Sequence, residues 1–215
     1  HSAIAVSATL EPHRFFGDVL GFPADETVAE SFPSPFFPEN RKVLIVPGIS
    51  TTFRRRTHSA PEVARLIRDV CSVKEGNYAV FFPSYAYLQI VHAHLHVPGA
   101  RLILQKEGMQ QADIGKIMDM LQDSDTTNVV LAIQGGSLAE GIDYTGSSLD
   151  GAIIVGIGLP QLSLENELLK KHFDETYAAG FQYAYLYPGM VRVIQSAGRV
   201  IRSENDTGFI ILMGR

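Results

Sequence analysis

Residues 128–137 read Asn-Val-Val-Leu-Ala-Ile-Gln-Gly-Gly-Ser, a mostly apolar run that stops at two glycines and a serine. Consecutive apolar residues without alternation predict a strand that is buried on both faces, as in the centre of a parallel sheet. Ligands bind beyond the carboxyl ends of the strands in such sheets, so the loop that follows is a candidate binding loop. A flexible turn whose glycines only satisfy the backbone geometry is the alternative interpretation.

Similar runs recur in both directions from this strand, separated by segments of helical length. The expected strands are Lys42–Val46, Tyr78–Phe82, Arg101–Leu104, Asn128–Ile133, Ala152–Ile157 and Phe209–Met213. The expected helices are Ala60–Ser72, Tyr85–His96, Met109–Asp123, Ser163–Ala178 and Gly189–Ser203. This alternation predicts right-handed crossovers and an α/β fold in which helices flank a mostly parallel sheet.

The composition is that of one globular domain. The chain has 215 residues, of which 46% are hydrophobic, and a net charge of −5. We find no apolar run long enough to span a membrane and no signal peptide. The single cysteine, Cys71, excludes an internal disulfide and an iron–sulfur cluster held by this chain's own cysteines. The net charge argues against a nucleic-acid coat protein but leaves room for a local basic groove, for which Arg54–Arg56 is the densest cationic run.

The first 40 residues read as a connector. Residues 31–38 are Ser-Phe-Pro-Ser-Pro-Phe-Phe-Pro, and such frequent prolines indicate an ordered connector or a sheet edge, not a central strand. The chain begins within one strand-like run and ends just after another. We therefore expect it to be a fragment of a longer protein.

Residues 195–202 read Gln-Ser-Ala-Gly-Arg-Val-Ile-Arg. The spacing of Gln195, Gly198, Arg199 and Arg202 predicts that they share one face of a helix. A glycine inside a helix costs roughly 1 kcal/mol relative to alanine, so we infer that Gly198 lets another surface or a ligand approach. Paired guanidinium groups suit a phosphate. A solvated polar face opposite a core face remains the alternative from spacing alone.

Residues 78–85, Tyr-Ala-Val-Phe-Phe-Pro-Ser-Tyr, form a third segment of interest, where a buried strand leads into a helix. Ser84 is expected to be the N-cap of that helix. The same hydroxyl and Tyr85 could instead meet the phosphate and sugar of a nucleic acid.

Three weaker candidates have ordinary structural explanations. His92, His94 and His96 suggest a metal site, but solvated helix histidines are favoured because no third ligand for the one pair that would share a helix face is evident nearby. The arginines of the Arg54–Arg56 run could face DNA, although a charged surface loop is the commoner case. Alternating tyrosines at 183, 185 and 187 are expected to form a packed, extended lead-in to the next helix.

Taken in order, these segments resemble the later motifs of superfamily-two helicases. Residues 6–10 resemble motif III, residues 81–85 motif IV, residues 136–143 motif V and residues 195–202 motif VI. The sequences "FFPSY", "SLAEGIDY" and "QSAGRVIRSENDTGFIILMGR" are similar to those of the XPD/DinG branch of these helicases. Each motif is short, but four in order on the expected elements are specific.

The resemblance implies the second motor domain of an ATP-dependent DNA helicase of 5′→3′ polarity. Its fold would be a RecA-like three-layer sandwich with a mostly parallel central sheet. Residues 1–40 would be the interdomain linker after motif III, and residues 41–215 the helicase C-terminal RecA-like domain. The alternative function is a non-catalytic nucleic-acid-binding or interaction module with RecA-like ancestry. An unrelated Rossmann-like enzyme is disfavoured because no G-x-G-x-x-G follows an early strand.

The resemblance also implies a role for individual residues. Arg199 and Arg202 would be arginine fingers, and Gln195 would place the γ-phosphate or the attacking water. Contacts to ATP would come from Asp143, Glu140, Gly141 and Gly198. Contacts to DNA would come from Ser84, Tyr85, Gly136, Ser137 and Arg54. We expect the arginine side chains to face the strand-end loops, toward a triphosphate held by the neighbouring lobe.

The sequence contains neither a G-x-x-x-x-G-K-[ST] motif nor a D-E-A-H box. We therefore expect ATP and Mg²⁺ to be bound mainly by an N-terminal RecA-like domain of the same protein, which could also carry an iron–sulfur cluster. That domain and single-stranded DNA are the expected partners, with no membrane contact. The expected location is the cytoplasm, at a bacterial nucleoid. The isolated chain is expected neither to hydrolyse ATP at a useful rate nor to unwind DNA.

Overall fold

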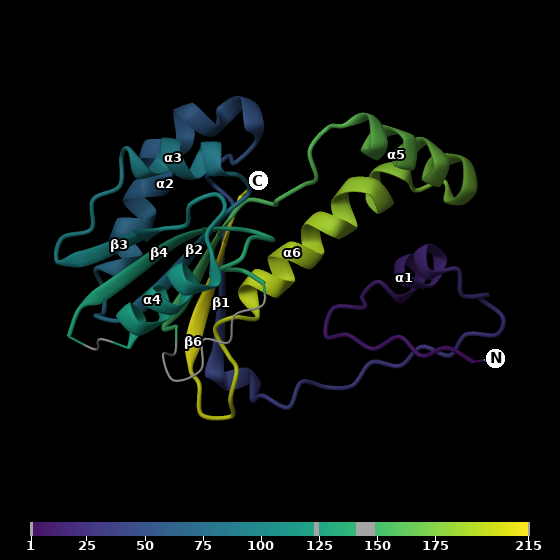
Figure 1. Cartoon of the computed structure of the whole chain (residues 1–215), viewed down its shortest axis with the longest axis horizontal. Coiled ribbons are helices and arrows are strands. Elements are labelled where there is room, and N and C mark those ends of the chain that lie inside the picture. The colour runs from purple at the N-terminus through teal and green to yellow at the C-terminus, as the bar shows by residue number, and fades with distance from the viewer. Residues whose placement is uncertain (1, 123–124, 141–148, 215) are drawn as a thin grey trace.

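The computed structural model describes residues 2–122, 125–140 and 149–214. A six-stranded, all-parallel sheet forms its centre, in the order β1-β6-β5-β2-β4-β3 (Figure 1). The strands are β1 (Arg41–Val46), β2 (Asn77–Phe82), β3 (Ala100–Leu104), β4 (Thr127–Ile133), β5 (Gly151–Val155) and β6 (Gly208–Met213). Each lies within one or two residues of the bounds that the apolar runs predict.

Helices cover both faces of the sheet and complete a three-layer α/β fold. One face packs against α2 (Arg56–Cys71) and α3 (Tyr85–His92). The other packs against α4 (Gln111–Leu121) and α6 (Tyr187–Ala197). The remaining helical elements are α1 (His13–Leu20), α5 (Leu164–Tyr177), the 3₁₀ turns η1 (Pro38–Asn40) and η2 (Phe53–Arg55), and the π-helical turn η3 (Gln182–Leu186).

The central strands are buried on both faces, which is why their sequences are apolar without alternation. Val80 and Phe81 on β2 are both completely buried, and they face the two separate cores. Strand β1 differs because it lies at the edge of the sheet, where Val43, Leu44 and Ile45 are exposed. Cys71 is buried at the end of α2, as expected, and burial raises its pKa to about 12.

The extended lead-in predicted for the three tyrosines is wrong. Tyr183 and Tyr185 lie in the π-helical turn η3, and α6 begins at Tyr187. Pro188 explains the wide turn, because a proline lacks the backbone donor and its ring crowds the carbonyl four residues earlier. Both phenol side chains are buried in this helical path.

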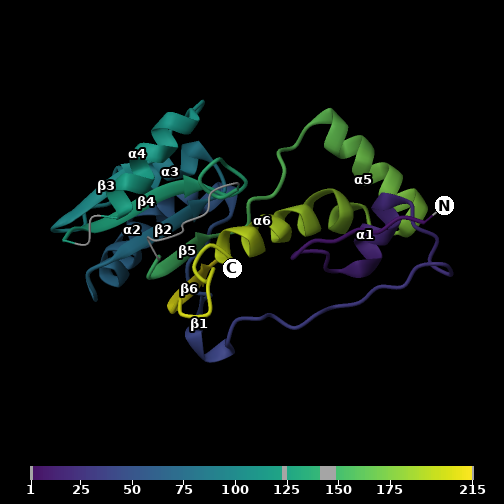
Figure 2. The same cartoon turned by 60° about the horizontal axis from the view of Figure 1, so that its bottom comes forward.

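Residues expected to form only a linker contain a helix that packs against the far end of α6. Figures 1 and 2 show α1 beside α5 and α6, away from the sheet. The Phe15 ring lies 5.0 Å from that of Tyr183, whose hydroxyl donates to Asp18 Oδ2 at 2.6 Å. Burial and this hydrogen bond raise the pKa of Tyr183 to about 12. The division of the chain at residue 40 stays a prediction.

Candidate nucleic-acid and nucleotide sites

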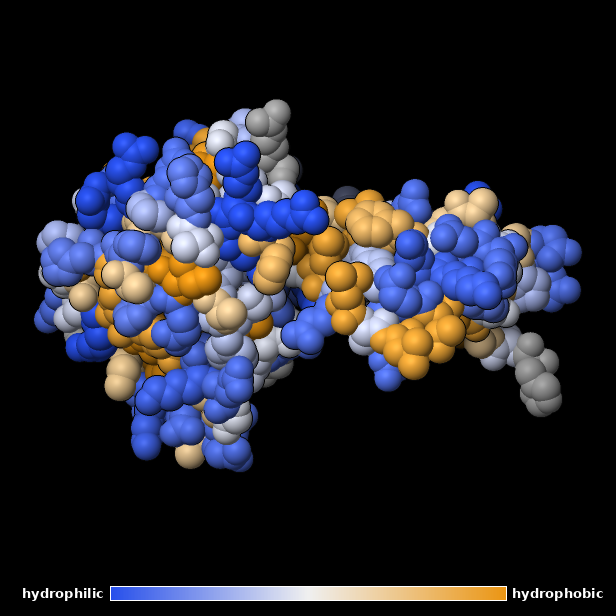
Figure 3. Space-filling view, turned by 90° about the horizontal axis from the view of Figure 1, so that it is seen from above, coloured by the Kyte–Doolittle hydropathy of each residue, from blue (hydrophilic) through white to orange (hydrophobic). Residues whose placement is uncertain are grey.

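The loops that follow the parallel strands meet at the upper edge of the sheet in Figure 1, which we call the carboxyl edge. A groove of about 930 Å³ runs along it, between the loops after β2, β4 and β5 on one side and α1, α5 and α6 on the other. Its polar lining includes Ser84, Gln134 and Arg192, and its apolar lining includes Phe15 and Leu159. Figure 3 looks down on this edge and shows apolar surface where the two parts of the molecule join.

Ser84 is the N-cap of α3, as predicted, and its side-chain oxygen accepts two hydrogen bonds. Its Oγ accepts from the backbone N of Tyr87 at 3.3 Å and from Arg56 Nη1 at 3.4 Å. The Arg56 guanidinium lies 5.0 Å from the centroid of the Tyr87 ring, and burial lowers its pKa. Both donors can only donate, so the Ser84 proton is left for an acceptor in the groove.

Tyr85, Gly136 and Ser137, predicted from two separate motifs, lie beside one another. A residue that the motifs did not indicate connects them: Gln105 Nε2 donates to Tyr85 Oη at 3.1 Å and to Ser137 Oγ at 3.3 Å. Tyr85 Oη in turn donates to the carbonyl of Lys106 at 3.3 Å, so this hydroxyl is engaged within the protein. The only signal of Gln105 in the sequence is an amide directly after an apolar strand.

Gln134 is a second buried amide that the motifs did not indicate. Its Nε2 donates to the carbonyls of Gly156, at 2.9 Å, and Phe81, at 3.3 Å, while its Oε1 accepts from Gly158 N at 2.8 Å. Arg192 Nη1 also donates to the carbonyl of Gly158, at 3.0 Å. These bonds tie the ends of β2, β4 and β5 together, and so they shape the floor of the groove.

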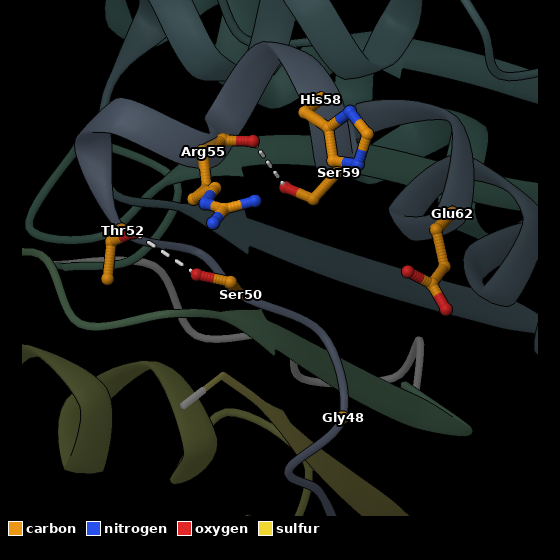
Figure 4. Close-up of a pocket in the computed structure, with 7 residues that line it drawn as sticks. All are labelled: Gly48, Ser50, Thr52, Arg55, His58, Ser59 and Glu62. Atoms are coloured by element: carbon orange, nitrogen blue, oxygen red, sulfur yellow. Dashed lines mark hydrogen bonds between the residues drawn. The ribbon is translucent and has the colours of Figure 1, made fainter.

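A smaller hollow of about 590 Å³ lies in the loop after β1 and the start of α2 (Figure 4). Its hydroxyls bond within the protein: Ser50 pairs with Thr52 at 3.1 Å, and Ser59 donates to the carbonyl of Arg55 at 3.0 Å. Arg54, the predicted DNA contact, is exposed on η2 and does not line the hollow. Its role stays a prediction.

The expected single helix face in motif VI is wrong. Helix α6 ends at Ala197, Gly198 is its C-cap, and of the four spaced residues only Gln195 is helical. After Ala197 the hydrogen bonds shorten to three residues, from Arg199 N to Ser196 O and from Val200 N to Ala197 O. The buried side chain of Val200 then draws the chain back onto the sheet instead of continuing the helix.

The expectation that the arginine side chains face the strand-end loops stays a prediction, because residues 141–148 of the loop after β4 lie outside the described residues. Helix α6 crosses the sheet, so that Arg192 lies at the carboxyl edge while Val200 packs beside Gly208, the first residue of β6. Arg202 is exposed in the turn before β6, and Arg199 is half-buried just before it. The backbone that carries the two arginines therefore lies near the start of β6, at the end of the strands opposite to the groove.

Asp206 holds the turn that carries Arg202. Its Oδ2 accepts from the backbone N of Arg202 and of Ser203, both at 2.7 Å, and its Oδ1 from Ser203 Oγ at 2.8 Å. Burial favours the neutral acid, but these three bonds outweigh it and lower the pKa of Asp206 below its usual 3.8.

We expect the replacement Asp206→Asn to loosen this turn, because an amide offers one acceptor oxygen where the carboxylate offers two. Hydrogen exchange of the Arg202 and Ser203 amides should accelerate. In the unchanged protein the two amides are protected while the Asp206 carboxylate is ionised, and the pKa of this group is lowered in the folded state. The protection should therefore be complete above pH 3.8 and be lost as the pH falls through the lower, folded-state pKa. Unchanged protection of both amides in the Asn variant would contradict the assignment.

The predicted ATP contacts are described only in part. Glu140 is exposed in the loop after β4, whereas Gly141 and Asp143 lie outside the described residues. In the described parts of the chain, no group of three His, Cys, Asp or Glu residues is placed to hold a metal ion. His92 ends α3 while His94 and His96 follow it, so no helix presents the expected pair. Among the same residues no helix is long and apolar enough to cross a bilayer.

Comparison with known proteins connects this geometry with one family. The chain is 27% identical to the putative ATP-dependent DNA helicase DDX11-like protein 8 of Homo sapiens over 99% of its length, and covers 27% of that protein. It is also 27% identical to the ATP-dependent DNA helicase DinG of Photobacterium profundum, again over 99% of its length and 31% of that protein. It therefore spans less than a third of the length of these relatives.

A solved structure named XPD helicase has the same fold, with a TM-score of 0.75 at 20% identity, over 97% of this chain and 38% of that one. The family described as the helicase C-terminal domain matches residues 67–215, which are more than half of the chain. This chain therefore belongs to the helicase C-terminal domain family, in its XPD/DinG branch, as the four motifs predicted.

Proposed function

We propose that the chain is the second motor domain of an ATP-dependent DNA helicase with 5′→3′ polarity. The carboxyl edge contacts single-stranded DNA, and the opposite edge presents Arg199 and Arg202 to ATP held by another RecA-like lobe. One observation carries the proposal. Ser84 and Tyr85 of motif IV line the groove and Gln105 joins Tyr85 to Ser137 of motif V, while Val200, between the two motif VI arginines, packs beside Gly208 at the opposite end of the strands.

Support for DNA contact comes from two hydroxyls at the carboxyl edge, one of which lines the groove. The hydroxyls of Ser84 and Ser137 both accept from donors inside the protein, and their protons are left for an outside acceptor. Phosphate oxygens are such acceptors, and backbone contacts of this kind give a grip that does not depend on base sequence. The relatives named ATP-dependent DNA helicases act on the same kind of polymer.

Support for a nucleotide-facing surface comes from the end of the connector. Asn40 Nδ2 donates to the carbonyl of Glu204 at 2.9 Å, so the connector enters the domain beside the turn that carries Arg202. Gly198 is exposed, and among the described residues a side chain there would meet only carbonyls of its own helix within 4 Å. Gly198 thus gives a neighbouring lobe room to approach close to the backbone beside Arg199.

We expect the isolated 215-residue chain to bind single-stranded DNA weakly and to show no ATP hydrolysis above background, because it lacks a P-loop lysine. Fluorescence anisotropy with a labelled 20-nucleotide oligo-dT and a coupled ATPase assay on the same sample measure both. Binding should weaken as salt rises, since neutralised phosphates release counterions. No binding at low salt would refute the DNA contact, and robust ATP turnover by pure chain would refute the division of labour between two lobes. A non-catalytic module would bind DNA equally well. When it is joined to an ATP-binding lobe, however, the rate of ATP hydrolysis would not depend on Arg199 and Arg202.

A further inference from the structure

The strongest unassigned feature is Gln105, the first residue after β3. It is 3% exposed, although nothing in the motifs requires a buried amide there. Its backbone N donates to Leu131 O at 2.8 Å, which extends the ladder between β3 and β4 by one bond. The side chain is thereby held under the loop after β4, and a Cβ on Gly136 would lie 2.6 Å from Nε2. A larger residue at position 136 would therefore have to displace the amide.

A backbone group fixes which end of the amide is which. The N–H of Ile133 can only donate, and it lies 3.0 Å from Oε1 of Gln105. The other end must therefore be the NH₂ group, which faces Tyr85 Oη at 3.1 Å and Ser137 Oγ at 3.3 Å. Because the NH₂ group can only donate, both hydroxyl oxygens are acceptors in these bonds.

The consequence differs between the two hydroxyls. The Tyr85 hydroxyl donates its own hydrogen bond to the carbonyl of Lys106, so its proton is already engaged within the protein. Ser137 is half-buried at the surface of the loop, and among the described residues its Oγ has no hydrogen-bond partner besides Gln105. The bond from the amide fills one lone pair of Ser137 Oγ and leaves its proton to be donated toward the outside, which suits an anionic oxygen.

We propose that Gln105 is a positioning residue of the nucleic-acid site, which fixes the Ser137 hydroxyl as a hydrogen-bond donor to a phosphodiester oxygen. This inference rests on the proposed function, since it assigns the chemistry of one DNA contact. Gln105 itself touches no ligand. It links the ends of β2, β3 and β4, so that the segments carrying Tyr85 and Ser137 keep a fixed separation.

The test is a double-mutant cycle on the whole chain, with labelled oligo-dT as the probe. Ser137→Ala removes the donor, and Gln105→Met keeps the buried volume while removing the amide. Each single change is expected to weaken binding by about three- to fivefold, the size of one hydrogen bond. The double variant is expected to be no weaker than Ser137→Ala alone, because Gln105 acts through Ser137.

A third variant, Gln105→Glu, reverses the direction of the bonds. A carboxylate can accept from Ile133 N as before, but its second oxygen turns the Ser137 proton inward and adds negative charge near the phosphate. We expect binding to weaken at least about tenfold, since a lost donor and a like charge act together. Urea unfolding of each variant identifies a loss of binding that comes from unfolding alone, and the Met cycle decides if the Glu variant fails to fold.

The outcomes separate the two proposals. If Ser137→Ala weakens binding but Gln105→Met does not, or if the two losses add, Gln105 is not a positioning residue and the DNA contact stands. If neither change affects binding by a folded chain, Ser137 is not a contact and both the positioning and that part of the DNA site are wrong.

Discussion

Replacing Arg199 by alanine, in a polypeptide that carries both RecA-like lobes, is expected to lower ATP turnover about 10³-fold or more, the effect of losing an arginine finger. The reason is electrostatic. A guanidinium stabilises charge that develops on the γ-phosphate only in the transition state, so its loss acts on turnover far more than on ATP affinity. Single-stranded DNA affinity should stay near that of the unchanged protein, because the groove lies at the opposite edge of the sheet.

Arg65→Ala is the matched control. This arginine is exposed on α2, where its nearest partner is Glu62 at 3.9 Å, and its removal takes away the same charge far from both surfaces. Steady-state turnover and anisotropy should be unchanged in the control. If Arg199→Ala keeps full ATPase activity in a folded protein, the finger assignment is wrong, and the alternative of a non-catalytic module gains ground.

The sheet was predictable from the sequence because its signal is local. Each central strand is a run of apolar residues that ends at a glycine, a proline or an amide, and burial on both faces leaves no other pattern possible. Strand β1 reads the same way although it is exposed at the edge. An apolar run therefore predicts the strand but not its place in the order.

Helix ends were less predictable because they depend on tertiary contacts. The sequence of motif VI permits helix up to Ser203, and intrinsic propensity does not forbid it. The observed end at Ala197 follows from the burial of Val200 and Ile201 beside β6 and from the Asp206 turn. Neither constraint is visible until the sheet order is known.

The residues of the candidate site also differ in how far the sequence predicts them. Ser84 and Ser137 were predictable as individual residues because they follow strands whose carboxyl ends must meet in a parallel sheet. Gln105 and Gln134 were not, because a single glutamine after a strand has no distinctive spacing. Their importance comes from partners far away in the chain, such as Gly158 for Gln134.

Gln134 yields the second large effect. Replacing it by leucine is expected to destabilise the chain by about 3 kcal/mol, because each buried polar group left without a partner costs about 1–3 kcal/mol. Two carbonyls, of Phe81 and Gly156, and one N–H, of Gly158, lose their bonds, and the site is too buried for water to replace them freely. Equilibrium urea unfolding measures the change as a lower midpoint at an unchanged slope.

Gln89→Leu is the control for this change, since Gln89 is an exposed glutamine on α3 and the same substitution there should leave the unfolding midpoint within error.

Binding of oligo-dT is expected to fall in Gln134→Leu even under conditions where the variant is folded. The loops after β2, β4 and β5 form the floor of the groove, and they lose the amide that fixes their spacing. Arg192 keeps one bond to Gly158, so the loss should be partial. A leucine variant as stable as the unchanged chain would mean that these backbone groups find other partners, and that the amide does not hold the carboxyl edge together.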